Sequence, residues 1–410
     1  MLINVKYGIR IMKLGIVSDF HLGYERFRAD AFKQAEEALS KVAELSDAIL
    51  IPGDIFDNRA PKPDVLAEGI VLFRELANRK WSAEIEEVVG NTKAYTKAPI
   101  VVIPGTHERR AVGEENPVSV LALAGLAVDA SDSLVVIRKG DERVAVRGIG
   151  GIAEERLRDY LKSTTFKPVE NAFNVLMLHQ SIYALMPFSS DFIHFDELPE
   201  GYDLYIDGHI HNRIERTVHG KPFIIPGSTV LTQLKEAEQD QKGFYVFDTQ
   251  TKMAEFHAIN TRRFVVVKVN VENKEPQEIN KEVYERIEKE AEKGDMPIIS
   301  VVLSGSLKKG FKTEDLSFSE IANMFEGKAI VEISGNGIEE ATTIANEFQQ
   351  EMNGGMSVRE LGTSILVEKL RQVGYSLDFP PLELFEILSK ESKEKAVKEA
   401  LEKLIQSKQE

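Results

Sequence analysis

The chain of 410 residues contains no cysteine. Disulfides and thiolate ligands are therefore excluded, and any metal ion must be bound through nitrogen and oxygen atoms. The lack of cysteine suits a reducing compartment, so we expect a cytoplasmic protein. The chain also lacks a run of about 18 consecutive apolar residues, which a membrane-spanning helix needs. We therefore expect a soluble protein with no membrane partner.

Positive charge is in the minority: 51 Lys and Arg residues stand against 66 Asp and Glu residues, for a net charge of -15. This balance argues against a protein that binds nucleic acid through a uniformly basic surface. It does not exclude nucleic acid as a substrate, because local patches and bound cations decide contact with phosphates.

Residues 1–11 carry no signal-peptide cleavage pattern, and Met12 begins a predicted strand that leads directly into the first motif. Met12 is therefore an alternative to Met1 as the true first residue. N-terminal sequencing of the native protein distinguishes the two.

The length exceeds what one hydrophobic core usually organises, so two domains are expected. Over residues 13–260 short apolar segments alternate with longer amphipathic ones, which predicts an α/β domain with buried strands. The pattern predicts a hairpin over residues 134–151, around Gly140 and Asp141. The other strands are predicted at 13–18, 48–52, 100–104, 174–178 and 204–206.

The pattern changes near Thr261, so we place the first domain at 12–261 and a smaller α+β domain at 262–372. The second domain is predicted to contain a charged helix at 276–294 and strands at 263–271, 297–303 and 328–334. A linker at 373–381 and a helical tail at 382–410 are predicted to follow. The apolar face of the tail either packs on its own domain or docks in a groove of a partner.

Polar side chains with metal-binding or acid–base chemistry follow five of the predicted strands. They are Asp19, His21, Asp54, Thr106, His107, Glu108, His179, His209 and His211. The carboxyl ends of strands are where open α/β sheets bind their ligands. Five of the eight histidines of the chain lie at these positions, whereas we expect structural roles for the other three, His194, His219 and His257. The repeated placement predicts a metal centre.

The spacing of these residues suits chelation. Residues two apart in a strand point to the same face, so Asp19 with His21, and His209 with His211, can each hold one ion. Mixed imidazole and carboxylate ligands favour Mn²⁺ or Fe over an all-oxygen Mg²⁺ site or a four-coordinate structural Zn²⁺ site. Two ions about 3.5 to 4 Å apart can hold both sides of a displacement at phosphorus. Asp54 is the expected bridging ligand.

The order Asp-x-His, Gly-Asp, Gly-Thr-His-Glu, His and Gly-His-x-His over residues 19–211 resembles the calcineurin-like metallophosphoesterase superfamily. Within it the chain resembles the DNA double-strand-break repair nucleases called Mre-eleven in archaea and SbcD in bacteria. That likeness rests on residues 19–24, 53–57, 113–117, 178–180, 208–212, 226–228 and 242–245. The resemblance implies a four-layer α/β sandwich, a capping domain, and a C-terminal helical tail that binds a coiled-coil ATPase called Rad-fifty or SbcC. It also implies a homodimer formed through the nuclease domain.

The resemblance also implies which residue does what. Asp19, His21 and His211 would bind one ion and His179 and His209 the other, with Asp54 and Thr106 contributing to both. His107, backed by Glu108, would face the phosphate and assist the transition state or the leaving group, which is typically worth about 10² to 10⁴ in rate. The alternative for His107 is a structural hydrogen bond within its loop.

Two positions depart from the family pattern. Thr106 stands where the family usually has Asn, and a hydroxyl is a weaker ligand than a carboxamide oxygen. Asp57 stands where several members have His, so the contribution of that His to exonuclease action is in doubt. Asp57 is also a candidate cap for the following helix.

Five arginines lie on loops expected to surround the ions and are candidates for contact with DNA phosphates: Arg26, Arg28, Arg59, Arg109 and Arg110. The alternative for each is solvation, or pairing with Glu114 and Glu115.

Three functions compete. The first is a Mn²⁺-dependent DNA exonuclease and endonuclease of a double-strand-break repair complex, with digestion from 3′ to 5′ implied by the resemblance. The second is a phosphodiesterase of the same fold acting on a small molecule, which the residues beyond 260 argue against, because small-substrate members usually lack them. The third is a catalytically weakened scaffold that binds DNA ends, in which Thr106 marks lost activity.

Overall fold

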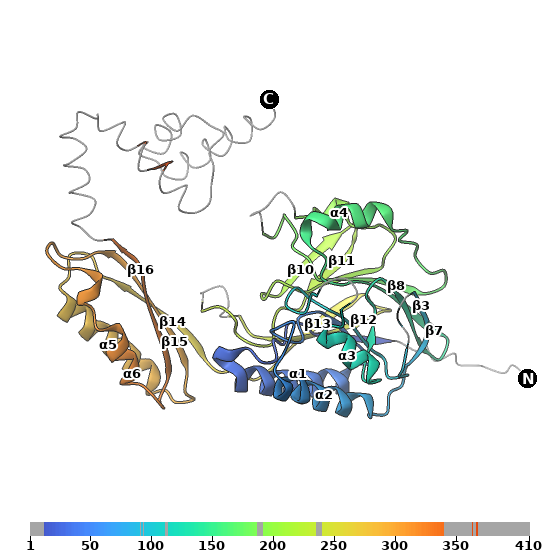
Figure 1. Ribbon diagram of the computed structural model, residues 1–410, viewed down its shortest axis with the longest axis horizontal. Coiled ribbons are helices and arrows are strands. Elements are labelled where there is room, and N and C mark those ends of the chain that lie inside the picture. The colour runs from blue at the N-terminus through green and yellow to red at the C-terminus, as the bar shows by residue number, and fades with distance from the viewer. Residues whose placement is uncertain are drawn as a thin grey trace, which may run out of the picture. The chain divides into compact units, whose positions relative to one another are not determined.

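The computed structural model describes residues 12–339 apart from 91, 93, 111–113, 187–191 and 235–239, together with 363, 366 and 367 (Figure 1). The predicted linker and tail, 373–410, lie outside the described residues. The chain divides into two compact units, 1–266 and 267–410. Each unit is described by itself.

Unit 1 contains two sheets. The six-stranded sheet has the order β13-β12-β1-β2-β4-β5, in which β1, β2, β4 and β5 are parallel. Its strands are β1 (Lys13–Ile16), β2 (Ala48–Pro52), β4 (Ile100–Ile103), β5 (Val128–Asp129), β12 (Gly243–Asp248) and β13 (Met253–Ala258).

The second sheet has seven strands in the order β10-β11-β9-β8-β7-β6-β3. Its centre, β7, β8, β9 and β11, is parallel. Its strands are β3 (Glu84–Val89), β6 (Leu134–Lys139), β7 (Glu142–Ile149), β8 (Phe173–Leu178), β9 (Leu204–Asp207), β10 (Ile214–Val218) and β11 (Lys221–Ile225).

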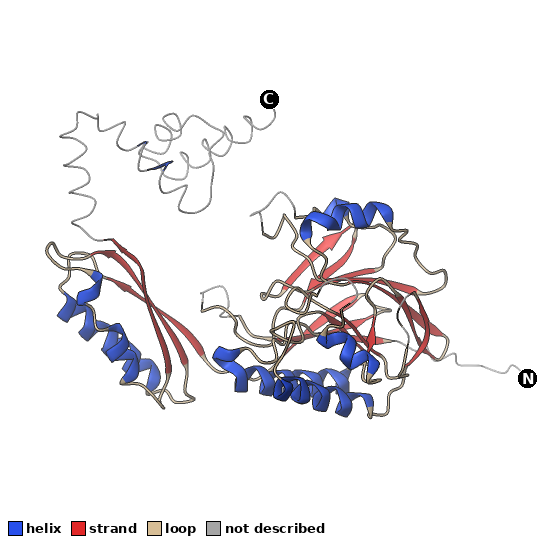
Figure 2. Cartoon of the chain, in the orientation of Figure 1, coloured by secondary structure: helices blue, strands red, loops and turns tan. Residues whose placement is uncertain are grey.

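Helices cover the outer faces of both sheets (Figure 2). One apolar cluster lies between the six-stranded sheet and α1 (Arg28–Leu45), α2 (Pro63–Ala77) and α3 (Pro117–Leu123). A second fills the space between the two sheets, and a third lies between the seven-stranded sheet and α4 (Glu154–Ser163). These layers confirm the predicted four-layer α/β sandwich. The described residues also form three short 3₁₀ helices, at Glu25–Phe27, Phe195–Glu197 and Thr313–Asp315.

The predicted strands of unit 1 are present to within two residues, and β6 and β7 form the predicted hairpin. The central strands were predictable because both of their faces are covered. In β2 and β4, for example, every residue is buried.

The described residues of unit 2, together with the first three residues of β14, form a three-stranded sheet with the order β14-β15-β16 and two helices. The strands are β14 (Phe264–Asn270), β15 (Ile298–Ser306) and β16 (Ile330–Glu339), and the helices are α5 (Pro276–Ala291) and α6 (Phe318–Asn323). The three strands and the charged helix agree with the predicted ones. Ile279, Val283 and Ile287, one turn of α5 apart, are fully buried. No helix within the described part of the chain is long and apolar enough to cross a membrane.

Candidate metal centre

The strand ends of both sheets meet at one site. β1, β2 and β4 of the first sheet, and β8 and β9 of the second, are parallel within their sheets, so their carboxyl ends lie along one edge. The loops that leave these ends carry all of the predicted metal ligands, which are Asp19, His21, Asp54, Thr106, His179, His209 and His211.

Four of these residues have backbone angles in the left-handed region. The φ angles are 54° at Asp19, 47° at His21, 50° at Asp54 and 69° at His209. Each costs on the order of 1–2 kcal/mol for a residue with a Cβ. Backbone hydrogen bonds hold the turns: the Asp19 amide donates to the Gly53 carbonyl at 3.2 Å, and the His21 amide to that of Asp54 at 3.1 Å. Strain of this kind collects where side chains are aimed at a ligand.

The first ligand group consists of Asp19, His21 and His211, with one possible ligand atom of each within 4.8 Å of the others. The Nε2 atoms of His21 and His211 lie 3.1 Å apart. Asp19 Oδ2 is buried and has no hydrogen-bond partner among the described residues. An unpartnered buried carboxylate oxygen beside two imidazole nitrogens fits a divalent cation.

The second group consists of Asp54, His179 and His209, which meet the same criterion. His179 Nδ1 lies 2.7 Å from the Pro52 carbonyl oxygen, so this nitrogen carries a proton. His179 Nε2 lies 3.2 Å from Asp54 Oδ2, but without the orientation of a hydrogen bond. We interpret the pair as two ligand atoms that converge on one point.

Thr106 lies against the second group, and a backbone hydrogen bond links that group to the first. Asp54 Oδ1 accepts a hydrogen bond from the His107 amide at 2.9 Å, and Thr106 Oγ1 donates to Asp54 Oδ2 at 3.4 Å. Thr106 Oγ1 also lies 3.5 Å from His209 Nδ1. The His209 amide in turn donates to Asp19 Oδ1 at 3.2 Å. The structure thus brings all seven predicted ligands together at one place.

Burial and charge shift the titration of these groups in opposite directions. Burial alone would raise the pKa of Asp54, but the neighbouring positive charge of His179 outweighs it and lowers that pKa well below its ordinary range. Burial likewise favours neutral His179, but Asp54 outweighs it and raises the pKa of His179 to about 10. Burial, followed by repulsion from His179, lowers the pKa of His209 to about 4.

His107 lies beside this centre on the loop after β4. Its ring contacts that of His21 edge-on, with centroids 4.8 Å apart. His107 Nδ1 lies 2.9 Å from the Asp57 carbonyl oxygen, which leaves Nε2 for a ligand. The His107 side chain is 44% exposed, so this nitrogen is within reach of a substrate.

Glu108 was expected to back His107, and the structure shows it anchoring the backbone of the loop on which His107 lies. Its side chain is fully buried and accepts hydrogen bonds from two backbone amides, Phe56 at 2.8 Å and Gly105 at 2.9 Å. Glu108 therefore connects the loop after β2 to the loop after β4. Burial, together with the nearby charge of Asp54, raises its pKa to about 8. A side chain in this position cannot touch a substrate.

Asp57 is not a helix cap. α2 begins at Pro63 and its N-cap residue is Lys62. The Asp57 side chain instead contacts the metal centre, with Oδ1 3.1 Å from His21 Nδ1. The sequence motif contained Asp57 but gave no sign of this contact.

One of the five candidate arginines is paired with acidic side chains, and the other four are exposed. Arg28 is paired with Asp64 at 2.8 Å and Glu68 at 2.9 Å, so its charge is already compensated. The guanidinium of Arg26 lies over the ring of Phe27. Arg110 Nε donates to the Arg59 carbonyl at 2.9 Å, which joins the loops after β2 and β4. Arg26, Arg59, Arg109 and Arg110 are exposed.

Three residues that were not among the predicted site residues, Lys242, Ser228 and Thr232, hold the loop with His211. The Lys242 ammonium is buried and donates to the His211 carbonyl at 3.1 Å and to Ser228 Oγ at 3.0 Å. Thr232 Oγ1 contacts His211 Nδ1. Lys242 and Ser228 belong to segments that carried the family resemblance, which was the only signal for them in the sequence.

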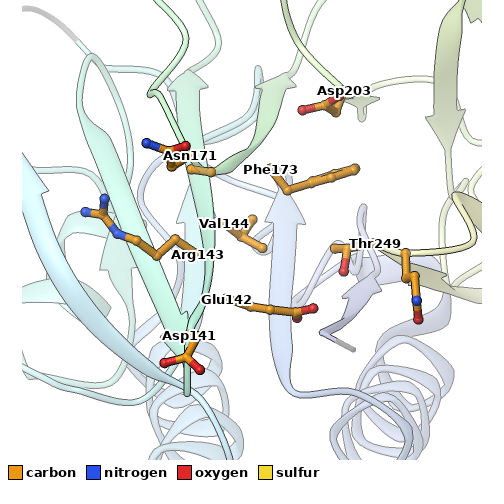
Figure 3. A pocket seen from close by; sticks show the side chains of 10 residues that line it. Asp141, Glu142, Arg143, Val144, Asn171, Phe173, Asp203 and Thr249 are labelled. Atoms are coloured by element: carbon orange, nitrogen blue, oxygen red, sulfur yellow. The ribbon is translucent and has the colours of Figure 1, made fainter. Parts of the chain in front are cut away.

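Unit 1 has a groove beside the metal centre and a pocket at the opposite ends of the strands. A groove of about 540 Å³ starts at Asp57, beside the metal centre, and is lined by Tyr24, Arg26 and Lys62 among others. The pocket in Figure 3 lies at the starts of β7 and β8, away from the strand ends that form the centre. Asp141, Glu142 and Asp203 line that pocket, so it is poorly suited to phosphate.

Comparison with known proteins places this site in a family. The model of the calcineurin-like phosphoesterase superfamily domain matches residues 12–252, which include every candidate ligand.

Three curated relatives are proteins of double-strand-break repair. Mre11 of Methanocaldococcus jannaschii is 27% identical over 63% of this chain and 69% of its own length. MRE11 of Encephalitozoon cuniculi is 29% identical over 57% of this chain and 45% of its own. Mre11 of Methanopyrus kandleri is 28% identical over 58% and 54%. The chain thus spans about half to two thirds of the length of these relatives. The domain match covers more than half of this chain, and the chain belongs to the calcineurin-like phosphoesterase superfamily.

Proposed function

We propose that this chain is the nuclease subunit of a DNA double-strand-break repair complex, and that it hydrolyses DNA phosphodiesters with two divalent ions. The observation that carries the proposal is the convergence of two ligand groups, Asp19–His21–His211 and Asp54–His179–His209, which are linked by the hydrogen bond from the His209 amide to Asp19 Oδ1. The similarity to proteins named for double-strand-break repair supports DNA as the substrate.

We assign Mn²⁺ as the preferred ion, with Fe and Mg²⁺ as alternatives. Four imidazoles and two carboxylates make up the two groups, and this donor set suits an intermediate ion more than Mg²⁺. When bound, two such ions supply Lewis acidity at the phosphoryl oxygens, lower the pKa of an attacking water, and hold both sides of an in-line displacement.

The protein groups position the reaction. The buried carboxylates of Asp19 and Asp54 fix the charge of the site, and the buried imidazole of His179 is oriented by the Pro52 carbonyl. His107, with Nδ1 held by the Asp57 carbonyl, directs Nε2 at the substrate, where it can stabilise the phosphoryl group or protonate the leaving oxygen. Glu108 holds the His107 loop in place rather than acting on the substrate.

The exposed arginines next to the centre suit a polyanionic substrate. Arg26 lines the groove that starts at Asp57, and the Arg110–Arg59 contact joins two loops that border the site. Backbone phosphates on either side of the scissile bond would meet such cations. We further propose that residues 262–372 cap the site, that residues 382–410 bind a coiled-coil ATPase of the Rad50 or SbcC kind, and that unit 1 forms a homodimer.

The first test measures degradation of an end-labelled duplex and a single strand with Mn²⁺, with Mg²⁺, and with chelator. We expect cleavage with Mn²⁺, and its loss by about 10²-fold or more in Asp54→Ala and in His107→Gln. His194→Gln is the matched control, because His194 belongs to neither ligand group. The label and the product lengths report the direction of digestion.

Three outcomes would contradict the proposal. If the wild type leaves DNA intact with every ion while Thr106→Asn cuts it, the chain is a weakened end-binding scaffold. If neither protein cuts DNA but a small phosphodiester is hydrolysed, the chain is a small-molecule phosphodiesterase. If His107→Gln retains full activity, His107 has only a structural role.

A further inference from the structure

Asp57 offers two different oxygen atoms to two different histidines. Its carboxylate Oδ1 lies 3.1 Å from His21 Nδ1, and its backbone carbonyl oxygen lies 2.9 Å from His107 Nδ1. The same carboxylate oxygen is 3.6 Å from His107 Nδ1, which is too far for a good hydrogen bond. The Asp57 side chain therefore accepts a hydrogen bond from His21, and its main-chain carbonyl accepts one from His107.

The carboxylate contact decides which ring nitrogen of His21 is available. A carboxylate oxygen accepts a hydrogen bond, so His21 Nδ1 must carry a proton to bind it. In the neutral ring the lone pair is then on Nε2, which points toward His211 Nε2, 3.1 Å away, and belongs to the group with Asp19. Orientation of a metal-binding histidine by a carboxylate on its other nitrogen is a general device.

We propose that the Asp57 carboxylate is a positioning residue for the Asp19–His21–His211 site, where it fixes the ring and the tautomer of His21 and so tightens binding of one of the two ions. The inference rests on the proposed two-ion function.

Asp57 contacts His21 through its side chain and His107 through its main chain, so substitution of the side chain tests the His21 contact alone. A change of the Asp57 side chain removes the acceptor for His21, but it leaves the carbonyl that holds His107. Asp57 is partly exposed, with 25% of its side chain accessible, and it borders a groove, so a smaller side chain there does not open a cavity in the core. Loss of metal affinity is therefore separable from loss of folding.

The test uses the full-length protein and two measurements that need no turnover. The first is Mn²⁺ binding, followed by the electron paramagnetic resonance signal of the free ion. The second is the ¹⁵N NMR spectrum of the histidine rings in the metal-free protein, in which the His21 signals are identified by their loss in His21→Gln. We expect Asp57→Ala to weaken one of two Mn²⁺ sites by about 10- to 100-fold and to shift the His21 nitrogens, with the His107 nitrogens unchanged.

Two further variants complete the test. Asp57→Glu retains the carboxylate and should recover part of the affinity. Glu25→Ala removes an acidic side chain from the same groove without touching either histidine, and it should leave both measurements unchanged. The proposal is overturned if Asp57→Ala binds Mn²⁺ as Glu25→Ala does, or if His107 shifts as much as His21. Absence of DNA cleavage by the wild type would reject the proposed function but would not alter the binding result.

Discussion

At the scale of single residues, His179 couples metal binding to pH. In the metal-free protein Asp54 raises the pKa of His179 to about 10, so the ring is protonated at neutral pH. A metal ion binds only the unprotonated nitrogen, so binding must release about one proton from this group. Below pH 10 the affinity for Mn²⁺ should therefore rise with pH, by up to about tenfold per pH unit.

Calorimetry tests this release. The metal-free protein is titrated with Mn²⁺ in two buffers of different ionisation enthalpy. The difference between the two binding heats should correspond to the release of about one proton per protein from this group. Ca²⁺, which prefers oxygen ligands, should displace fewer protons and serves as the comparison. Equal heats in the two buffers would mean that His179 is already neutral, and would reject the assigned protonation.

The sequence indicated the candidate ligands, which the structure brings together, but not the residues that contact them. Asp19, His21, Asp54 and the three later histidines could be predicted because each follows an apolar strand directly. The contacts of Asp57 with His21 and of Glu108 with Phe56 could not, because each joins residues 36 to 52 positions apart. Such contacts depend on loop conformations that no local pattern encodes.

At the scale of elements, the turn after β2 requires glycine for two reasons. Gly53 has a φ of +94°, and a Cβ there would lie 2.4 Å from His179 Nδ1 and 2.9 Å from the Cα of Gly105. The turn between β10 and β11 requires only the conformation, since Gly220 has a φ of +72° and nothing within 4 Å of a Cβ. Substitution of Gly220 therefore tests backbone strain alone, whereas substitution of Gly53 adds a steric clash with His179.

We expect Gly220→Ala to lower the free energy of unfolding by about 1–2 kcal/mol and to leave Mn²⁺ affinity unchanged. Gly53→Ala should cost more and should also weaken Mn²⁺ binding, because His179 must move to admit the new methyl group. Thermal unfolding of the metal-free proteins and Mn²⁺ titration are the measurements. If both variants bind Mn²⁺ like the wild type, the packing of β2 against His179 does not set the geometry of the site.

Continuous burial made some strands predictable but did not decide every case. β12 was missed although it is buried from Gly243 to Phe247, and β14 was predicted although buried and exposed residues alternate in it. β8 is buried along almost its whole length, and the apolar run at 174–178 marked it. The edge strands β3 and β13 were missed, because exposed residues interrupt both of them, Glu86 and Glu87 in β3 and Met253 and Glu255 in β13. Their pairing is set by the neighbouring strands β6 and β12 rather than by their own sequences.

At the scale of the whole molecule, the net charge of -15 limits how DNA can be bound if the proposed function holds. Long-range attraction cannot supply the affinity, so we expect binding to depend on the metal ions and on a few local arginines. The change of sequence pattern near residue 261 lies close to residue 266, where the chain divides into two compact units. The proposal that residues 262–372 cap the site stays a prediction, because the sequence pattern within each part says nothing about how the two parts are arranged.

Substitutions of Arg109 and Arg79 test whether DNA binding depends on arginines near the metal centre or on the charge of the whole surface. Both are exposed, but Arg109 follows the His107 loop, whereas Arg79 follows the far end of α2. α2 has 15 residues, which span about 22 Å, so Arg79 is well removed from the groove at the start of that helix. Either substitution by alanine changes the net charge by the same amount.

We expect the His107→Gln variant to bind DNA without cutting it. In this background we expect Arg109→Ala to reduce the slope of log affinity against log salt by about 1. Arg79→Ala should leave the slope unchanged, because it meets no phosphate. Fluorescence anisotropy with a short duplex, in Mn²⁺ and over a range of salt concentrations, measures both. If the two variants lower affinity equally with the same slope, the surface charge acts as a whole, and the arginines beside the metal centre do not contact the DNA backbone.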